Sequence, residues 1–181
     1  MTKHSITLGI ILKSTPVGEA NLRLHILTAD GIITATATGA QKPTAKLKAS
    51  TQIFTIAEFE ITTNKLTGAR VLSSPMPLTK EINRYYLACS IAEVLLSIKN
   101  HDAQMFIHTI RTFEELTSTT TSAYKIFIDY FSKLLTLLGL DIDIKTPETL
   151  GLAVAKKLVL QINAAFIEHL DISIPCVAQF V

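Results

Sequence analysis

The chain has 181 residues, of which 48% are apolar and 18% charged, so wholesale disorder is excluded and the length allows one ordinary domain or two small ones. The net charge of +2 excludes little by itself, but the charges are unevenly distributed. Residues 1–80 carry nine Lys or Arg and four Asp or Glu, whereas residues 81–181 carry eight and eleven. A positive first part and an acidic second part favour two units with different roles.

The first 75 residues predict a β-rich part. Short runs that are β-branched, or that alternate between apolar and polar side chains, are separated by turn residues such as Asp30-Gly31. Five strands are expected over residues 6–12, 22–27, 32–40, 51–62 and 69–74, with turns at 15–21, 28–31 and 62–68. Their number and spacing indicate a small closed or partly open barrel. An OB-fold has that strand count, and an SH3-like barrel fits the periodicity nearly as well.

After residues 73–79, which contain two prolines and no periodicity, the apolar pattern becomes helical. We place the domain junction there. Helices are expected over residues 82–98, roughly 103–116, 124–140 and 146 to about 170, the last with Thr146 as N-cap and Pro147 at its first position. The sequence therefore predicts an α+β chain in which a barrel is followed by a helical bundle.

No apolar run approaches the roughly 18 residues that a membrane-spanning helix needs. Lys3 is followed by a seven-residue apolar run that ends before Lys13, and no small-residue cleavage site comes after it. We interpret this run as the first strand rather than as a signal peptide, and we expect a cytoplasmic protein.

Motifs for catalysis or metal binding are not found in the sequence, and we predict neither a metal nor a cofactor. The five histidines lack metal-ligand spacing, and Cys89 and Cys176 stand far apart in apolar surroundings, as expected of buried free thiols. No glycine-rich nucleotide motif and no G-x-S-x-G occurs. Asp141 and Asp143 are expected to be solvated or capping side chains. A hydrolase or nuclease is therefore disfavoured, and we predict that the protein is not an enzyme.

The stretch TGAQKPTAKLKAST, residues 38–51, joins two predicted strands and contains three lysines and no acid. Lys42, Lys46 and Lys48 are candidates for holding phosphates, because binding driven by counterion release needs only positive charge at suitable spacing. A solvated loop without a binding role is the alternative interpretation.

Other cations of the same predicted domain add to this charge, namely Lys13, Arg23, Lys65 and Arg70. Aromatic side chains are few: Phe54 and Phe59 are the two in the first 80 residues, and both are expected in the core. A base-stacking platform is therefore not supported. Binding of a nucleic acid by this domain should be mainly electrostatic and tolerant of sequence.

A protein-interaction module with little affinity for DNA is the alternative function. It would dock an acidic peptide with an apolar end against the helices, and Lys156 and Lys157 are exposed candidates for pairing with the acids of that peptide. An ordinary solvated helix face explains these two lysines as well.

The stretch GIILKSTPVGEANLRLHILTADGIITATATGAQKP resembles the opening of the bacterial RecO family of DNA repair and recombination proteins. The family pattern is matched by a "GE" turn at Gly18-Glu19, a hairpin from Thr28 to Gly31, and Gly39-Ala40, after which the family has basic residues. The segment LKASTQIFTIAEFEI is similar to the next part of the family pattern at Gln52, Phe54, Thr55, Glu58 and Glu60. In the helical part, YYLACSIAEVLLSI, with Glu93, and FIDYFSKLLTLLGLDIDI also resemble the family.

The resemblance implies an N-terminal OB-fold DNA-binding domain, residues 1–78, and a helical domain, residues 79–181. It implies a cytoplasmic, nucleoid-associated protein that binds single- and double-stranded DNA, anneals strands and helps RecA loading. The implied partners are RecR and the C-terminal tail of single-stranded DNA-binding protein. No hydrolytic chemistry and no membrane association are implied.

Three departures from the family pattern matter. Many members carry a four-cysteine zinc site after the third predicted helix, whereas DIDIKTPETLG contains no cysteine, so a zinc-less member is expected. The chain is shorter than most members, which suggests reduced partner surfaces in the helical half. Gln41-Lys42 stands where the family often has two arginines, and the lost charge puts tight DNA binding in doubt.

Overall fold

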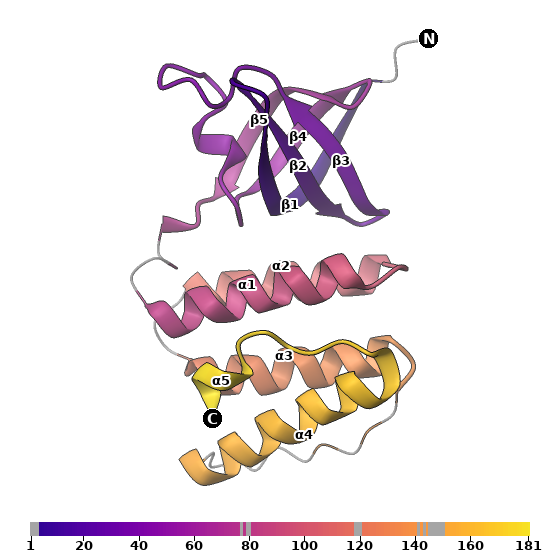
Figure 1. The fold of residues 1–181 in the computed structure, drawn as a ribbon. Helices are drawn as coiled ribbons and strands as arrows, with labels where there is room; N and C mark the ends of the chain where they lie inside the picture. The colour runs from indigo at the N-terminus through magenta and orange to yellow at the C-terminus, as the bar shows by residue number, and fades with distance from the viewer. Residues whose placement is uncertain are drawn as a thin grey trace. The chain divides into compact units, whose positions relative to one another are not determined.

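The computed structural model describes residues 4–76, 78, 81–117, 121–140, 142, 144 and 151–181. Contacts divide the chain into two compact units, Met1–Met76 with Asn100–Ile110, and Pro77–Lys99 with Arg111–Val181. Five strands form the first part of the chain and helices follow (Figure 1). The predicted α+β fold class is confirmed, while the domain bounds 1–78 and 79–181 stay a prediction.

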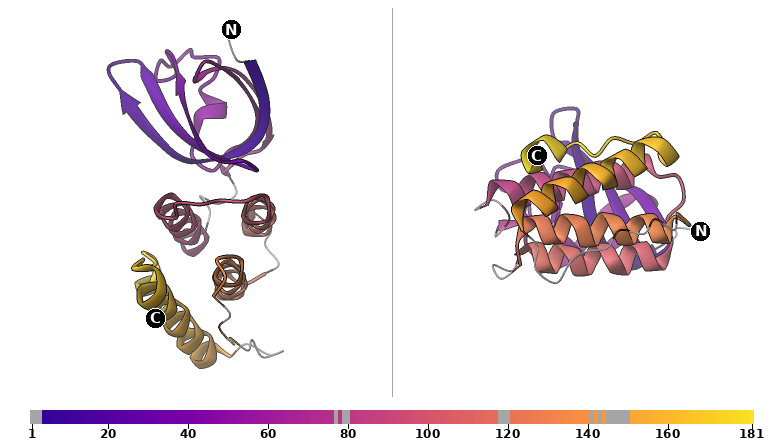
Figure 2. Two further views of the ribbon diagram at one scale, coloured as in Figure 1. Left: turned by 90° about the vertical axis from the view of Figure 1, so that its right-hand side faces the viewer. Right: turned by 90° about the horizontal axis from the view of Figure 1, so that it is seen from below.

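The five strands close into a barrel with the order β1-β2-β3-β5-β4, in which β3 and β5 are parallel and the other pairs antiparallel. This order is that of an OB-fold and not of an SH3-like barrel. Figure 2 shows the strands curving round to close on themselves. The strands are β1 (His4–Val17), β2 (Asn21–Thr28), β3 (Gly31–Ala37), β4 (Ile56–Thr62) and β5 (Lys65–Ser73).

The first strand closes the barrel because its two halves pair with different neighbours. The first half of β1 pairs with β4, the second half pairs with β2, and Gly9 pairs with both. A Cβ at Gly9 would lie 2.5 Å from Cγ2 of Ile26 and 2.9 Å from the carbonyl oxygen of Leu27. Glycine is therefore required where the neighbouring backbone approaches most closely.

The strand predicted over residues 32–40 ends at Ala37, and strand boundaries differ by more at three other places. The predicted turn 15–21 was too long, because β1 continues to Val17 and the chain turns over residues 18–20. The turn 62–68 was also too long, because β5 begins at Lys65. The strand predicted from residue 51 begins only at Ile56, after a short 3-10 helix, η1 (Ala49–Thr51).

The late start of β4 has a local cause. Phe54 has a φ of 69°, in the left-handed region that interrupts a strand. Its N–H donates to the Ile11 carbonyl oxygen at 2.7 Å, and the Ile11 N–H donates to the Thr55 carbonyl oxygen at 3.1 Å. Residues 54–55 thus pair with β1 next to its irregularity between Ile11 and Lys13. The alternation of apolar residues continues across this break, so periodicity alone could not locate it.

The barrel core contains the apolar residues that alternation predicts. In β4, Ala57, Phe59 and Ile61 are buried, while Glu60 is exposed. Ten buried residues form the core cluster: Ile11, Leu24, Ile26, Ala35, Ala37, Ala40, Ala57, Phe59, Ile61 and Leu66.

The helices are α1 (Ile82–Ser97), α2 (Ala103–Thr117), α3 (Ala123–Leu137), α4 (Leu152–Leu170) and α5 (Val177–Phe180). Of these, α3 has contacts with α1 and α4, and Phe127, Ile128, Phe131 and Leu135 are among its buried residues. Ring centroids of Phe131 and Phe166 lie 5.5 Å apart in an edge-to-face arrangement, and Phe127 and Phe180 lie 5.2 Å apart. Such aromatic pairs add to the stabilisation from burial.

The polar side of α3 carries an N-cap and an ion pair. The Ser122 hydroxyl accepts from the Lys125 N–H as an N-cap, and Lys125 Nζ lies 2.8 Å from the Asp129 carboxylate. The predicted start of the last helix at Thr146-Pro147, like the Asp141 and Asp143 pair, lies outside the described residues. The helix that the structure describes there begins at Leu152, after Gly151.

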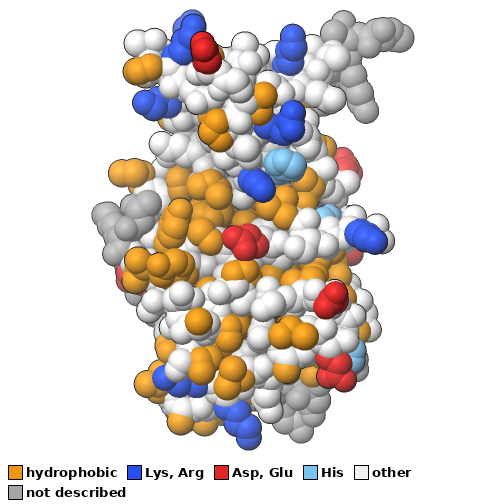
Figure 3. Space-filling model, viewed as in Figure 1, with side chains coloured by type: hydrophobic (Ala, Val, Ile, Leu, Met, Phe, Trp, Pro, Cys, Tyr) orange, Lys and Arg blue, Asp and Glu red, His pale blue; other side chains and the backbone are white. Residues whose placement is uncertain are grey.

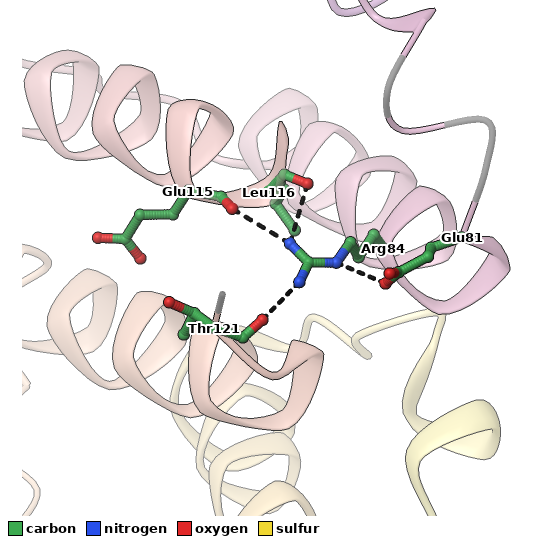
Figure 4. A network of polar contacts seen from close by, with 5 residues as sticks. All are labelled: Glu81, Arg84, Glu115, Leu116 and Thr121. Carbon is green, nitrogen blue, oxygen red and sulfur yellow. Dashed lines mark hydrogen bonds and ion pairs between the residues drawn. The ribbon is translucent and has the colours of Figure 1, made fainter. Parts of the chain in front are cut away.

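A buried arginine connects α1 to the end of α2 (Figure 4). Arg84 is 5% exposed, and its Nη1 donates to the carbonyl oxygens of Glu115 at 3.2 Å and Leu116 at 3.1 Å. Its Nη2 donates to the Thr121 carbonyl oxygen, and its Nε lies 2.6 Å from the Glu81 carboxylate. The guanidinium therefore satisfies backbone carbonyls that the end of a helix leaves without partners.

Candidate functional site

The six barrel cations that the sequence singles out fall into two groups. Lys13, Arg23 and Lys65 lie on three different strands and are exposed. Lys42, Lys46 and Lys48 are exposed in the connection between β3 and β4. Figure 3 shows lysine and arginine side chains gathered over the barrel.

The strand register brings the first group onto one outer surface of the barrel. One cross-strand row consists of Thr15, Arg23, Thr36 and Lys65. The neighbouring row consists of Lys13, His25 and Thr34. We call these seven residues the basic face. It spans β1, β2, β3 and the start of β5 and contains no acidic residue.

The pKa of His25 responds to the positive charges of the basic face. Its side chain is half-buried, and burial lowers the pKa of the imidazole, with further lowering by the charges of Lys13 and Arg23. Sequence reasoning treated His25 as one of several isolated histidines. Strand alternation in residues 22–27 was a usable signal, because it places His25 on the same side as Arg23.

The lysine-containing connection is fixed at its start. The Gln41 side-chain amide donates to the carbonyl oxygens of Asn21 at 2.7 Å and Gly18 at 3.3 Å, and the Gln41 N–H donates to the Ala20 carbonyl oxygen at 3.0 Å. These contacts hold the connection against the turn between β1 and β2, the strands that carry Lys13 and Arg23. Gln41, noted from sequence as a lost charge, is thus a structural anchor.

The rest of the connection is also ordered. The Ala45 N–H donates to the Lys42 carbonyl oxygen at 3.0 Å, and the Lys48 N–H donates to the Ala45 carbonyl oxygen at 3.1 Å. Leu47 packs against the barrel core between the exposed side chains of Lys46 and Lys48. The ammonium groups are therefore presented by successive turns and not by an unstructured loop.

A different outer surface of the barrel is acidic and apolar. Ile6 pairs with Glu60 and Leu8 with Glu58 across β1 and β4. Arg70 lies 2.7 Å from the Glu58 carboxylate, and this contact lowers the pKa of Glu58 and raises that of Arg70. The positive charge of Arg70, which the sequence added to the domain total, is therefore offset by Glu58.

The two lysines proposed for a partner peptide are not equivalent. Lys157 is exposed on α4. Lys156 is half-buried, and its Nζ donates to the Val181 carbonyl oxygen at 2.5 Å. The expectation that both are exposed was wrong for Lys156, because the helix turns that side chain toward the segment that follows α5.

The cysteines are free thiols, with Cys176 buried and Cys89 half-buried. Burial raises the pKa of Cys176 to about 11, which makes its thiolate scarce at neutral pH. Among the described residues, no three His, Cys, Asp or Glu side chains gather as a metal site. Within the same part of the chain, no helix has the length and apolar character needed to cross a membrane.

Comparison with known proteins finds similarity to RecO proteins. The family model described as "Recombination protein O N terminal" matches residues 1–74. The DNA repair protein RecO of Synechococcus elongatus is 33% identical over 102 residues, which cover 54% of this chain and 38% of that protein. The RecO protein of Gloeothece citriformis is 32% identical over 103 residues, which cover 54% of this chain and 36% of that protein.

The matched segments span less than two fifths of these relatives and about half of this chain. The likeness of the helical segments to the family therefore stays a prediction. The residues matched by the family model contain the whole barrel and the basic face. Residues 1–74, which form the barrel, are therefore similar to the N-terminal part of the RecO family.

Proposed function

We propose that the protein binds single- and double-stranded DNA through its barrel and acts, without catalysing a reaction of its own, in recombinational repair. Its contribution would be to anneal strands and, with RecR, to help load RecA. The RecO relatives are named as DNA repair proteins, which supports the repair role. The main structural support for the proposed DNA binding is the basic face.

The basic face suits a phosphate backbone. Lys13, Arg23 and Lys65 supply charge from three strands, and the threonine hydroxyls between them can donate hydrogen bonds to phosphate oxygens. In OB-folds the surface of the second and third strands is a frequent site for oligonucleotides. Because the contacts are to phosphates, most of the affinity should be independent of sequence and sensitive to salt.

Anisotropy titrations of labelled single- and double-stranded oligonucleotides test the proposal at its simplest. Binding of both forms that weakens steeply with added salt is the expected result. Absence of binding to either form at low salt would contradict it. Faster annealing of complementary strands in the presence of the protein, beyond the spontaneous rate, tests the further step.

A pH dependence centred on His25 is the first specific prediction. Free protein keeps His25 neutral below the ordinary pKa of 6.5, because the charges of Lys13 and Arg23 oppose protonation. The contribution of this group to folding stability is therefore lost as the pH falls from 6.5 through the lower folded pKa, since the unfolded chain takes up the proton first.

Bound phosphates would reverse that effect and raise the pKa of His25. DNA affinity should then increase as the pH falls from about 7.5 to about 5.5, by up to about tenfold for each pKa unit regained. In a His25→Gln variant, affinity should change little over the same range. An equally steep pH dependence in the variant would show that another group is responsible.

A second role, docking of an acidic peptide on α4, is favoured by one observation. Lys157 is exposed, and the apolar side chains of Leu160 and Ile167, each 47% exposed, follow it along the helix. An acidic peptide with an apolar end, such as the C-terminal tail of single-stranded DNA-binding protein, matches this combination of a cation and apolar contacts.

Titration of a labelled acidic tail peptide tests the second role. Lys157→Glu should weaken its binding about fivefold or more through charge reversal at the contact. Lys133→Glu, an exposed lysine on α3, carries the same change of charge and should bind as the unmodified protein does. No binding at high micromolar peptide, or equal losses in both variants, would count against this surface.

A further inference from the structure

A hollow of about 180 Å³ lies in the barrel at the turn between β4 and β5. It is lined by Ser5, Ile33, Thr34, Ile61, Thr63 and Asn64. Thr34 also belongs to the basic face, and Lys65 follows Asn64 directly, so the hollow adjoins that face. None of its lining residues is charged.

Polar groups around the hollow are available to a ligand. The hydroxyls of Ser5, Thr34 and Thr63 and the side-chain amide of Asn64 make no hydrogen bond within the described part of the chain. Ser5, Thr34, Thr63 and Asn64 are all exposed, so the hollow is open to solvent. The apolar part of the lining comes from Ile61 of the core cluster and from Ile33, which packs against it.

The turn that forms one rim is held in an unusual conformation. Thr63 and Asn64, the two residues between the paired Thr62 and Lys65, have φ values of 48° and 61°. A β-branched residue rarely adopts this region, and such strain is often kept at ligand-binding positions. The Asn64 carbonyl oxygen accepts the Thr36 N–H at 2.8 Å, which fixes the turn against β3. The rim is therefore set before any ligand arrives.

We propose that the hollow takes one unstacked pyrimidine base of a DNA strand whose phosphates lie along the basic face. A cavity of about 150 Å³ is known to hold benzene, so the volume suits a single six-membered ring and is small for a two-ring purine. The hydroxyls and the amide match the donors and acceptors on the edge of a pyrimidine, and the isoleucines offer a surface for its ring. This inference rests on the proposed DNA binding and adds a preference for pyrimidine that phosphate contacts alone do not give.

Binding of three labelled oligomers with equal numbers of phosphates tests the inference. One carries thymine, one adenine and one no bases, each of about 15 nucleotides, and all are titrated by anisotropy at the same salt. The thymine oligomer should bind about tenfold more tightly than the abasic one, in the range that one well-held base contributes. The adenine oligomer should bind less tightly than the thymine oligomer.

Two variants are expected to remove the preference for the thymine oligomer over the abasic one, and both leave the residues of the basic face unchanged. Asn64→Gly deletes the amide and suits the positive φ, so the turn should be retained. Ser5→Leu narrows the mouth with an apolar side chain. Both variants should bind the abasic oligomer as tightly as the unmodified protein does. Each should bind the thymine oligomer no more tightly than it binds the abasic one. Thr38→Ala, exposed beyond the end of β3 and outside the hollow, should keep the preference.

The outcomes separate this inference from the function on which it rests. Equal affinity of the unmodified protein for the thymine and abasic oligomers would overturn the base-binding hollow but leave DNA binding intact. A preference that survives both variants would place base recognition elsewhere and also overturn it. No binding of any oligomer would overturn the proposed function itself. Photocrosslinks from 5-iododeoxyuridine should map to the peptide containing Thr63 and Asn64, and crosslinks confined to other peptides would contradict the site.

Discussion

Replacing Lys13, Arg23 and Lys65 together by alanine is expected to lower single-stranded DNA affinity roughly 100-fold at low salt. Each neutralised phosphate contributes about 0.7 to the slope of log K against log salt for a single strand, so the slope should become about 2 smaller in magnitude. The three side chains are exposed and make no ion pair within the described residues, so folding should be preserved. Anisotropy at several salt concentrations measures both quantities.

A matched control distinguishes loss of the basic face from loss of net positive charge. Lys99, Arg111 and Lys133 are exposed outside the barrel strands, and their replacement by alanine removes the same charge. The control should retain the slope of the unmodified protein within error. If the two triple variants lose affinity equally, the effect comes from net charge and the basic face is not the binding surface.

The lysines of the connection between β3 and β4 are examined by the same measurement. A bound DNA strand that continues from the basic face over this connection would also contact Lys42, Lys46 and Lys48. Changing these three lysines to alanine would then lower the magnitude of the slope of log K against log salt by about another 2. We expect this result, because Gln41 holds the connection against the turn between β1 and β2. An unchanged slope would restrict the site to the strands and leave the three lysines solvated.

Arg84→Met is expected to destabilise the protein by about 2–4 kcal/mol, because it leaves several backbone carbonyls without their donor. The guanidinium contacts the ends of α1 and α2 and the segment before α3 at once, as Figure 4 shows. Methionine fills a similar volume, so the loss reports the polar contacts and not a cavity. Urea unfolding followed by circular dichroism measures the change.

Two further variants sharpen the Arg84 experiment. Arg84→Lys keeps the charge but not the planar fork of donors, so it should recover only part of the stability. Arg111→Met alters an exposed arginine on α2 and should change stability by less than about 0.5 kcal/mol. Equal stability of Arg84→Met and Arg111→Met would show that the buried network adds little to the folded state.

Much of the fold was predictable because local patterns determine it. Period-two alternation in β4 placed Ala57, Phe59 and Ile61 in the core, and the change to a helical apolar pattern after residues 73–79 indicated where the helices follow the strands. The choice between an OB-fold and an SH3-like barrel was not predictable from periodicity. It depends on the parallel pairing of Thr36 with Lys65, a contact between distant parts of the chain that no local pattern encodes.

The sequence named three cations of the candidate site but not the arrangement of the basic face. Composition singled out Lys13, Arg23 and Lys65, and the register that joins them appears only when β3 meets β5. The contact of Lys156 with the Val181 carbonyl oxygen depends on how α5 returns to α4, which sequence spacing does not specify. The hollow was missed for the same reason, because its lining comes from three separate parts of the chain, at Ser5, Ile33-Thr34 and residues 61–64.

The most direct measurement is a residue-by-residue NMR titration of the protein with a short single-stranded oligonucleotide at low salt. Amide shifts should be largest along the basic face, at Arg23, His25, Thr34 and Thr36, and small at Glu58 and Glu60 of β4. That pattern would establish the outer surface of β1–β3 as the DNA-binding surface. Shifts concentrated on β4 or on the helices, or none at all, would contradict it.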